Sequence, residues 1–448
     1  MELTHENSFS YKKFLCIVVL LIVTIIIDTS IVKVYDLVYK AFINEQIKLL
    51  VFSINSFLGL ALQFIIIVYL QKIFRKQPLN KQINIYLLSK ISLISLSAIG
   101  ILMGLLMLQQ FYNNSYQSSI TIFIIILSYG TAAGLIIRLS ISFLYWFNST
   151  HNLIVFLYFI SMILISFNLI MTCTLAITKI NDKPEEIRRY VGGTADLSGN
   201  KHQLLDKIYK VSAIVSFVSI WITTVLIINR YREKAIVNFV VLCILLSLPL
   251  LYFLTSYAFQ FILFDIFNTN LRVDPVSVAI VFTAVLSLSK PIGGLTFAIA
   301  FWNISKTLRY EKNIMTYMII SGWGILLLFG TNQALLQTFS PYPPFGLVTI
   351  SVLITAVFLL LLGIYNSTTL VSVNNNLRKQ IHKHASEINF LGEMGHSEKE
   401  REIKRIVSKI NVHVDRSRNP DISVEIDENE LKKYIDLVLS ETKKNIEK

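Results

Sequence analysis

The chain has 448 residues, of which 54% are hydrophobic and only 15% are charged, and its mean hydropathy is +0.60. Soluble domains carry about 25% charged residues, so this composition excludes an ordinary soluble protein and indicates a chain that lies largely in a membrane. The net charge of +13 does not indicate a nucleic-acid partner, because the basic excess lies in short segments between apolar stretches. Three cysteines without a Cys-x-x-Cys pair predict neither a disulfide scaffold nor a metal site.

Apolar stretches long enough to cross a bilayer recur along most of the chain. A transmembrane helix needs roughly 20 apolar residues, whereas barrel strands would need an alternating pattern that is absent here. Ten stretches meet the length requirement: 13–33, 50–70, 86–108, 120–147, 153–177, 208–229, 236–257, 276–302, 314–337 and 345–368. The sequence therefore predicts an all-α polytopic transmembrane helix bundle over residues 1–370, followed by a short helical cytoplasmic tail over residues 371–448.

Lysine and arginine are distributed unevenly between the segments that connect these spans. The short connections 109–119 and 338–344 contain none, whereas basic residues are concentrated in the alternate segments 12–13, 72–81, 230–234, 306–312 and 378–383. Positively charged connections stay on the cytoplasmic side of a membrane. We therefore expect a multi-pass protein of the plasma membrane, with both termini in the cytoplasm and the long connection 178–207 outside.

The third and fourth spans each carry two glycines four residues apart. Gly100 and Gly104 lie in the third span, and Gly130 and Gly134 lie in the fourth. Small residues at this spacing let two membrane helices approach closely, so the four glycines predict a packed antiparallel hairpin. Arg138 leaves two registers open for the fourth span: the helix continues to residue 147, or 139–147 forms an interfacial turn.

The eighth span contains a lysine and a proline near its middle. Lys290 and Pro291 are followed by Gly293 and Gly294. Proline kinks or breaks a helix, and a lysine at bilayer depth costs at least ~2.5 kcal/mol. Transporters build substrate sites from broken helices with an inward-facing charge, whereas a lysine that extends to the inner headgroups would only mark topology. We predict that Lys290 faces the bundle and contacts freed carbonyls or an acid.

Three further residues are candidates for binding a ligand or an ion. Asp28 lies inside the first span near its outer end, and it either pairs with Lys290 or Arg138 or extends to outer water. Asn332 and Gln333 form a polar outer end of the ninth span. These two residues either line a pocket or cap the helix.

Motifs in the late spans resemble those of a known group of proteins. They are Ser289-Lys290-Pro291-Ile292-Gly293-Gly294 with Phe301-Trp302, the stretch SPYPPFGLV over 340–348, and Leu377-Arg378-Lys379-Gln380-Ile381 in the tail. With these residues the chain resembles an expanded archaeal family of multi-span membrane proteins over residues 190–410. The family has no assigned activity, so the resemblance implies an architecture and transfers no functional residue.

The tail begins as a continuation of the last span. Its apolar positions alternate by four and three residues, which is typical of a coiled coil: Leu377, Ile381, His384, Ile388 and Leu391. Residues 371–414 are therefore expected to contact a cytoplasmic protein or a second copy of the chain. The bilayer itself is the other expected partner.

The sequence leaves three functions open. The tail makes a membrane sensor or signalling scaffold, acting through the C-terminal helix, the function that the sequence favours slightly over the others. The broken eighth span favours a secondary transporter, and Ser89-Lys90 and Ser289-Lys290 would match if two five-helix halves formed an inverted repeat. A structural or assembly subunit is the third possibility. No phosphate loop or nucleophile motif occurs, so we expect no enzyme activity and no cofactor.

Overall fold

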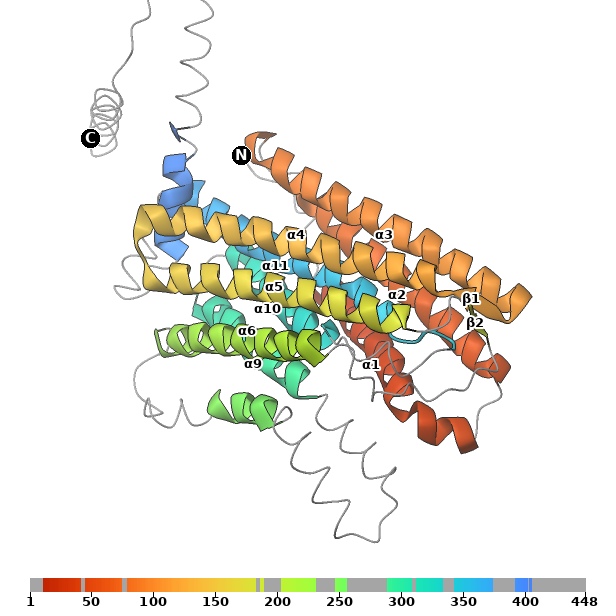
Figure 1. Cartoon of the computed structure of the whole chain (residues 1–448). Helices are drawn as coiled ribbons and strands as arrows, with labels where there is room; N and C mark the ends of the chain where they lie inside the picture. Colours follow the sequence, from red (N-terminus) through yellow and green to blue (C-terminus); the bar gives the residue numbers. More distant parts are fainter. Residues whose placement is uncertain are drawn as a thin grey trace, which may run out of the picture. The chain divides into compact units, whose positions relative to one another are not determined.

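The computed structural model of the protein describes residues 11–41, 45–74, 79–182, 186–188, 203–230, 246–255, 288–307, 312–332, 342–373, 391–401 and 403–404. Nearly all of these residues are helical (Figure 1). The labelled helices are α1 (Tyr11–Ala41), α2 (Glu45–Phe74), α3 (Leu79–Asn113), α4 (Ser118–Thr150), α5 (Leu153–Asn181), α6 (Gln203–Arg230), α9 (Ser289–Thr307), α10 (Lys312–Thr331) and α11 (Leu347–Val373).

Seven of the described helices are long and apolar enough to cross a membrane. They are α2, α3, α4, α5, α6, α10 and α11. The predicted helical membrane bundle is therefore confirmed in its class, while the number of ten spans stays a prediction. Three of the predicted spans fall partly outside the described residues, at 236–245 with 256–257, at 276–287 and at 333–337. A shorter apolar helix covers Leu246–Thr255 within the first of these spans.

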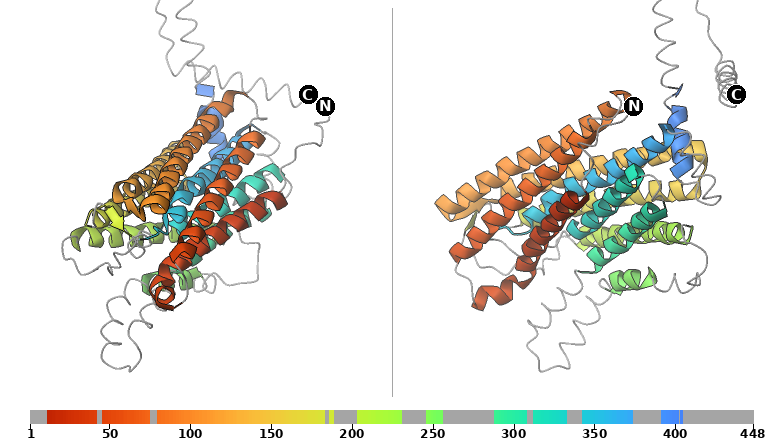
Figure 2. Two further views of the ribbon diagram at one scale, coloured as in Figure 1. Left: turned by 90° about the vertical axis from the view of Figure 1, so that its right-hand side faces the viewer. Right: turned by 180° about the vertical axis from the view of Figure 1, so that it is seen from behind.

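Helix α11 is enclosed by the other helices along most of its length. Residues 347–364 are all buried, and α11 contacts α1, α2, α3, α4 and α10. Two opposite views show α11 passing between these helices (Figures 1 and 2). A helix that is apolar on all sides is suited to such a buried position, because no face of it has to meet water.

Glycines bring α10 and α11 into close contact. A Cβ atom on Gly324 would lie 2.5 Å from the Leu360 nitrogen and 2.9 Å from the Ala356 oxygen. On the facing helix, a Cβ atom on Gly363 would lie 2.5 Å from the Tyr317 oxygen. Each glycine therefore meets the backbone of the partner helix, which is how small residues let membrane helices pack.

The glycine hairpin predicted for the third and fourth spans is wrong. A Cβ atom would meet nothing within 4 Å at Gly104, Gly130 or Gly134, and at Gly100 only the Leu60 side chain at 3.9 Å. Gly130 and Gly134 are exposed, because α4 turns a different face towards its neighbours: Ile125, Tyr129, Ala132, Ala133 and Ile136. Helices α3 and α4 do touch, but through other residues, and the Thr131 hydroxyl donates to the Ser95 hydroxyl at 3.1 Å.

The register of the fourth span is settled by the length of α4. The helix runs without interruption to Thr150 and ends at His151, whose φ of 52° places it in the left-handed region and whose N–H donates to Phe147. The interfacial turn at 139–147 is therefore excluded. Arg138 lies 20 residues after the helix start, about 30 Å along the axis, which is the depth of one hydrocarbon core.

A small sheet joins two connections at one end of the bundle. Strands β1 (Ser115–Gln117) and β2 (Glu186–Arg188) pair antiparallel, with Tyr116 opposite Ile187. The connections 109–119 and 178–207 must therefore lie at the same end, as the distribution of basic residues predicted. Figure 1 shows the two strands beside the end of α3.

The other end of the bundle contacts part of the tail. Residues 391–401 are helical, Leu391 and Met394 are buried, and Gly395 lies against Val371 of α11. The Asn152 side-chain amide donates to the Glu393 carboxylate. The first compact unit consequently extends to Ser397, beyond the boundary expected at residue 370, and the second covers Glu398–Lys448. Most of the predicted coiled coil, residues 374–390, lies outside the described residues.

Candidate polar site around Lys290

Helix α9 begins directly before the lysine and proline of the candidate site. Leu288 forms a turn, the helix starts at Ser289, and the Ile292 N–H donates to the Leu288 carbonyl at 3.0 Å. Pro291 thus occupies the first turn, where its missing N–H and fixed φ are tolerated. Lys290 and Pro291 therefore lie in the first turn of α9. The earlier part of the predicted span, residues 276–287, lies outside the described residues, so the predicted break of the eighth span stays a prediction.

Gly293 and Gly294 lie where α9 packs closely against two neighbouring helices. A Cβ atom on Gly293 would overlap the ring of Phe217 in α6. A Cβ atom on Gly294 would lie 2.8 Å from the Phe329 Cβ and 3.2 Å from the Leu326 oxygen in α10. The two glycines therefore let the start of α9 approach α6 and α10 closely enough for Lys290 to contact both helices.

The Lys290 ammonium points into the bundle, as predicted. Its Nζ donates to the backbone oxygen of Asn332 at 3.1 Å and to the hydroxyl of Tyr209 at 3.2 Å. It also lies 5.5 Å from the centre of the Tyr209 ring, within the range of a cation–π contact. The side chain is half-buried. The carbonyl acceptor comes from the end of α10, and not from a break within α9.

Amide and hydroxyl groups connect this lysine to α5 and α6. The Asn332 amide donates to Asn168 Oδ1 at 2.9 Å, and the Asn168 amide donates to Ser212 Oγ at 3.0 Å. The Ser212 hydroxyl donates to the Tyr209 carbonyl at 2.8 Å, which closes the chain of contacts. Sequence reasoning missed Asn168, Ser212 and Tyr209. Asn168 had a detectable signal, because it is an amide in the middle of an apolar span.

Two buried polar atoms at this site have no hydrogen-bond partner among the described residues. One is Asn332 Oδ1 and the other is the hydroxyl of Tyr129. Tyr129 is 1% exposed and lies close enough to Tyr209 and Cys173 to interact with them electrostatically. Buried polar atoms are nearly always hydrogen-bonded, so these two atoms are candidates for binding a further hydrogen-bonding group.

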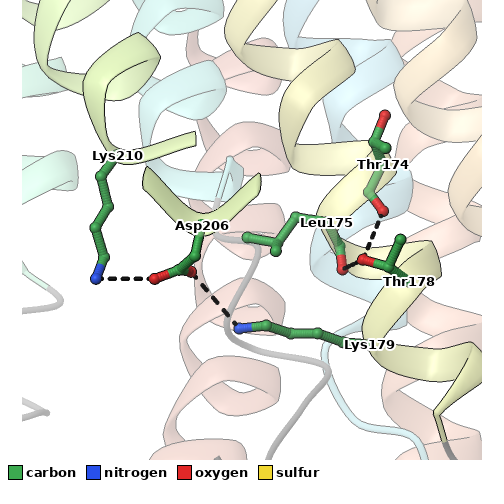
Figure 3. Close-up of polar contacts among 6 residues, drawn as sticks. All are labelled: Thr174, Leu175, Thr178, Lys179, Asp206 and Lys210. Carbon is green, nitrogen blue, oxygen red and sulfur yellow. Dashed lines mark hydrogen bonds and ion pairs between the residues drawn. The ribbon is translucent and has the colours of Figure 1, made fainter. Parts of the chain in front are cut away.

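No carboxylate of the described residues contacts the Lys290 ammonium. The nearest acid along α6, Asp206, pairs with Lys210 at 2.9 Å and lies 4.0 Å from Lys179 of α5 (Figure 3). In the same figure the Thr178 hydroxyl donates to carbonyls of its own helix. The charge of Lys290 is therefore held by neutral acceptors alone, in the part of the chain that the structure describes.

The site begins at the level of this ion-pair cluster and extends deeper along α5. Tyr209, which accepts from Lys290, directly precedes Lys210 and lies one turn after Asp206. Asn168 precedes Lys179 by 11 residues in one continuous helix, which is about 16 Å along the axis. If the charged residues mark the headgroup region, Asn168 lies in the hydrocarbon region, where polar side chains are rare and are by default a sign of function.

The remaining candidates are separated by the fold. Asp28 is fully buried but contacts neither Lys290 nor Arg138, and its carboxylate accepts from the N–H of Thr349 at 2.9 Å and from its hydroxyl at 2.7 Å. The predicted pairing of Asp28 with Lys290 or Arg138 is therefore wrong, and so is the alternative in which its side chain extends to outer water. Gln333 lies outside the described residues. The site thus consists of Lys290 and Asn332 from the predicted set, together with the residues of α4, α5 and α6.

Comparisons with known proteins add nothing to this geometry. The chain matches no protein-family profile, no curated protein and no solved structure.

Proposed function

We propose that the protein is a secondary transporter that binds a small organic anion at Lys290. The observation that carries the proposal is the Lys290 ammonium, which lies among helices and, within the described residues, is held only by the neutral groups Asn332 O and Tyr209 Oη. A carboxylate would be a stronger acceptor for this ammonium than either neutral group, because charge-assisted hydrogen bonds are about twice as strong. The start of α9 adds the positive end of a helix dipole at the same place.

The unpaired atoms of the site narrow the class of anion. Asn332 Oδ1 can only accept a hydrogen bond, so a ligand that reaches it must present a donor. The Tyr129 hydroxyl can either donate or accept. A short hydroxy acid matches Lys290 and Asn332 together: its carboxylate accepts from the Lys290 ammonium, and its hydroxyl donates to Asn332 Oδ1.

The wild-type protein tests this proposal directly. Purified full-length protein should bind radiolabelled glycolate saturably and should carry it into proteoliposomes down a concentration gradient. Acetate, which lacks the hydroxyl, should bind about 10-fold more weakly, since one hydrogen bond to the site is lost. Saturable binding of neither anion overturns the proposal.

A signalling function is the second candidate, because the tail contacts the buried helix of the bundle. Gly395 lies against Val371 at the end of α11, so a movement of α11 can reach the segment 391–397. Glycolate binding without uptake, together with a change in protease cleavage after Val373, would favour this sensor over the transporter.

We further propose that the end of the bundle with β1 and β2 faces outward and that both termini are cytoplasmic. Asp182 is exposed, and the Lys404 side chain is 71% exposed, so both positions accept a reporter. In a background without the three native cysteines, Asp182→Cys should react with an impermeant maleimide in intact cells. Lys404→Cys should react only after permeabilisation, and the reverse pattern would invert the topology.

A further inference from the structure

A second buried polar group lies among α1, α2 and α11, apart from the Lys290 site. The Asp28 carboxyl is 0% exposed, and its Oδ2 accepts both hydrogen bonds from Thr349, in the first turn of α11. Its other oxygen, Oδ1, is buried and has no hydrogen-bond partner among the described residues. The Gly346 N–H, directly before α11, also interacts with the carboxyl. The group is therefore stabilised as an acceptor at the start of α11, while the atom Oδ1 is left without a hydrogen bond among the described residues.

The polar neighbours around Asp28 are neutral. On α2, the Asn55 amide donates to the Thr24 carbonyl at 3.2 Å, one turn before Asp28. Further along the same face, Gln63 bonds to Ser351 and Thr355 of α11 at 2.8 Å and 3.1 Å. No cation balances the carboxylate here, and one of its oxygens has no hydrogen bond among the described residues, so the charged form is costly in a medium without water.

The charged side chains described on the helices that contact α1 do not balance the negative charge of Asp28. Helices α2, α10 and α11 touch α1, and their described titratable side chains are Lys48, Tyr69 and Lys72 on α2, Lys312 and Tyr317 on α10, and Tyr365 on α11. Lys48 is the nearest of these in register, but none of the interactions of Asp28 involves it. The others lie further along their helices: Tyr365, for example, follows Thr349 by 16 residues, about 24 Å.

The two polar groups lie at the same level of the bundle. Helices α10 and α11 run antiparallel, with Gly324 beside Leu360 and Gly363 beside Ser321. Extending this register places Asn332 level with Val352, three residues after Thr349. Asp28 contacts Thr349 at the start of α11, and Lys290 contacts Asn332 at the end of α10. The two contacts therefore belong to the two helices of one tightly packed pair.

We propose that Asp28 is a proton-binding site, with the proton carried on Oδ1. Uptake of a proton from water converts the carboxylate to a neutral carboxyl, while Oδ2 keeps its two hydrogen bonds from Thr349. In the transporter proposed above, this would be the coupling proton for the anion at Lys290. That extension rests on the proposed function, whereas proton binding at Asp28 does not.

Dicyclohexylcarbodiimide, an apolar reagent, tests the site without any substrate. A carbodiimide nitrogen takes the acid proton and the carboxylate oxygen adds to the central carbon, so only a protonated carboxyl yields the stable acylurea. With full-length protein in liposomes, mass spectrometry should find the adduct on Asp28, rising as the pH is lowered. Asp206, which is paired with Lys210 and Lys179, is the matched control and should stay unlabelled.

Variants at Thr349 give a second, independent measurement. Thr349→Val removes the hydroxyl that donates to the carboxylate, so half-maximal labelling should move to higher pH by about one unit. Thr349→Ser keeps a hydroxyl and should restore the wild-type profile. If Thr349→Val does not fold, the wild-type profile and the Asp206 control still decide the proposal.

Three outcomes would overturn proton binding at Asp28. The adduct is absent at every pH, or labelling is equal on Asp206, or sodium ions suppress labelling at constant pH, which would make Asp28 a sodium site. Labelling of Asp28 that persists in Lys290→Met, after glycolate binding has been lost, would separate the two sites. Failure of the anion proposal therefore leaves the proton proposal testable by itself.

Discussion

Lys290→Met is expected to abolish anion binding while the folded protein is retained. Methionine has a similar length but cannot donate, so the ligand carboxylate loses its only charged partner among the described residues. Removing one partner of a buried charged pair costs about 2–5 kcal/mol, so affinity for glycolate should fall at least ~30-fold. Membrane insertion should be unchanged or improved, because methionine is apolar whereas a lysine within the membrane opposes insertion.

Lys90→Met is the matched control for this measurement. Lys90 also follows a serine, but it is exposed, and its ammonium lies 4.6 Å from the centre of the Tyr86 ring on its own helix. Isothermal titration with glycolate should give wild-type affinity for this variant. Wild-type affinity in Lys290→Met, with a single elution peak and an unchanged melting temperature, would contradict the site.

Gly324→Leu is expected to remove most of the folded protein. The added atoms would meet the backbone of α11 at Leu360 and Ala356, and a helix backbone cannot rotate away as a side chain can. Overpacking of a core typically costs about 1–3 kcal/mol even where side chains can adjust, so the cost here should be at the upper end or above. The yield of monodisperse protein in gel filtration measures the effect.

Gly130→Leu is the corresponding control on a lipid-facing surface. Gly130 is exposed on α4, and no atom lies within 4 Å of the Cβ position. We expect its yield to match that of the wild type, since leucine suits lipid. Equal losses in Gly324→Leu and Gly130→Leu would contradict the helix contact that the structure places at α10 and α11.

The Lys290 site shows how far local sequence information reaches. A lysine beside a proline in an apolar stretch is visible as an anomaly in the sequence alone, and its inward orientation follows from the cost of placing an ammonium in lipid. Its acceptors come from Tyr209 and Asn332, which belong to other helices. No spacing rule within one helix connects these positions, so the polar network with Asn168 could not be predicted.

Asp28 is a second residue for which the sequence and the tertiary structure give different information. That a carboxyl inside an apolar span is exceptional could be recognised from the sequence, but its partner could not. The structure pairs it with Thr349, a residue 321 positions later, and not with either of the basic residues that charge alone suggested. Electrostatic attraction indicates which partners are favourable, whereas the packing of α1 against α11 decides which group is within reach.

Length and hydropathy determined by themselves that this chain is a bundle of membrane helices, because the transfer of an apolar helix into lipid depends on its own residues only. Only the tertiary structure decided which face of each helix meets a neighbour. Lipid and protein interior are both apolar, so the hydropathy of a span barely distinguishes a face that packs from one that faces lipid. For that reason Gly130 and Gly134 were assigned to a helix contact although both are exposed, whereas the close glycine contact of the structure lies at Gly324 and Gly363, between α10 and α11.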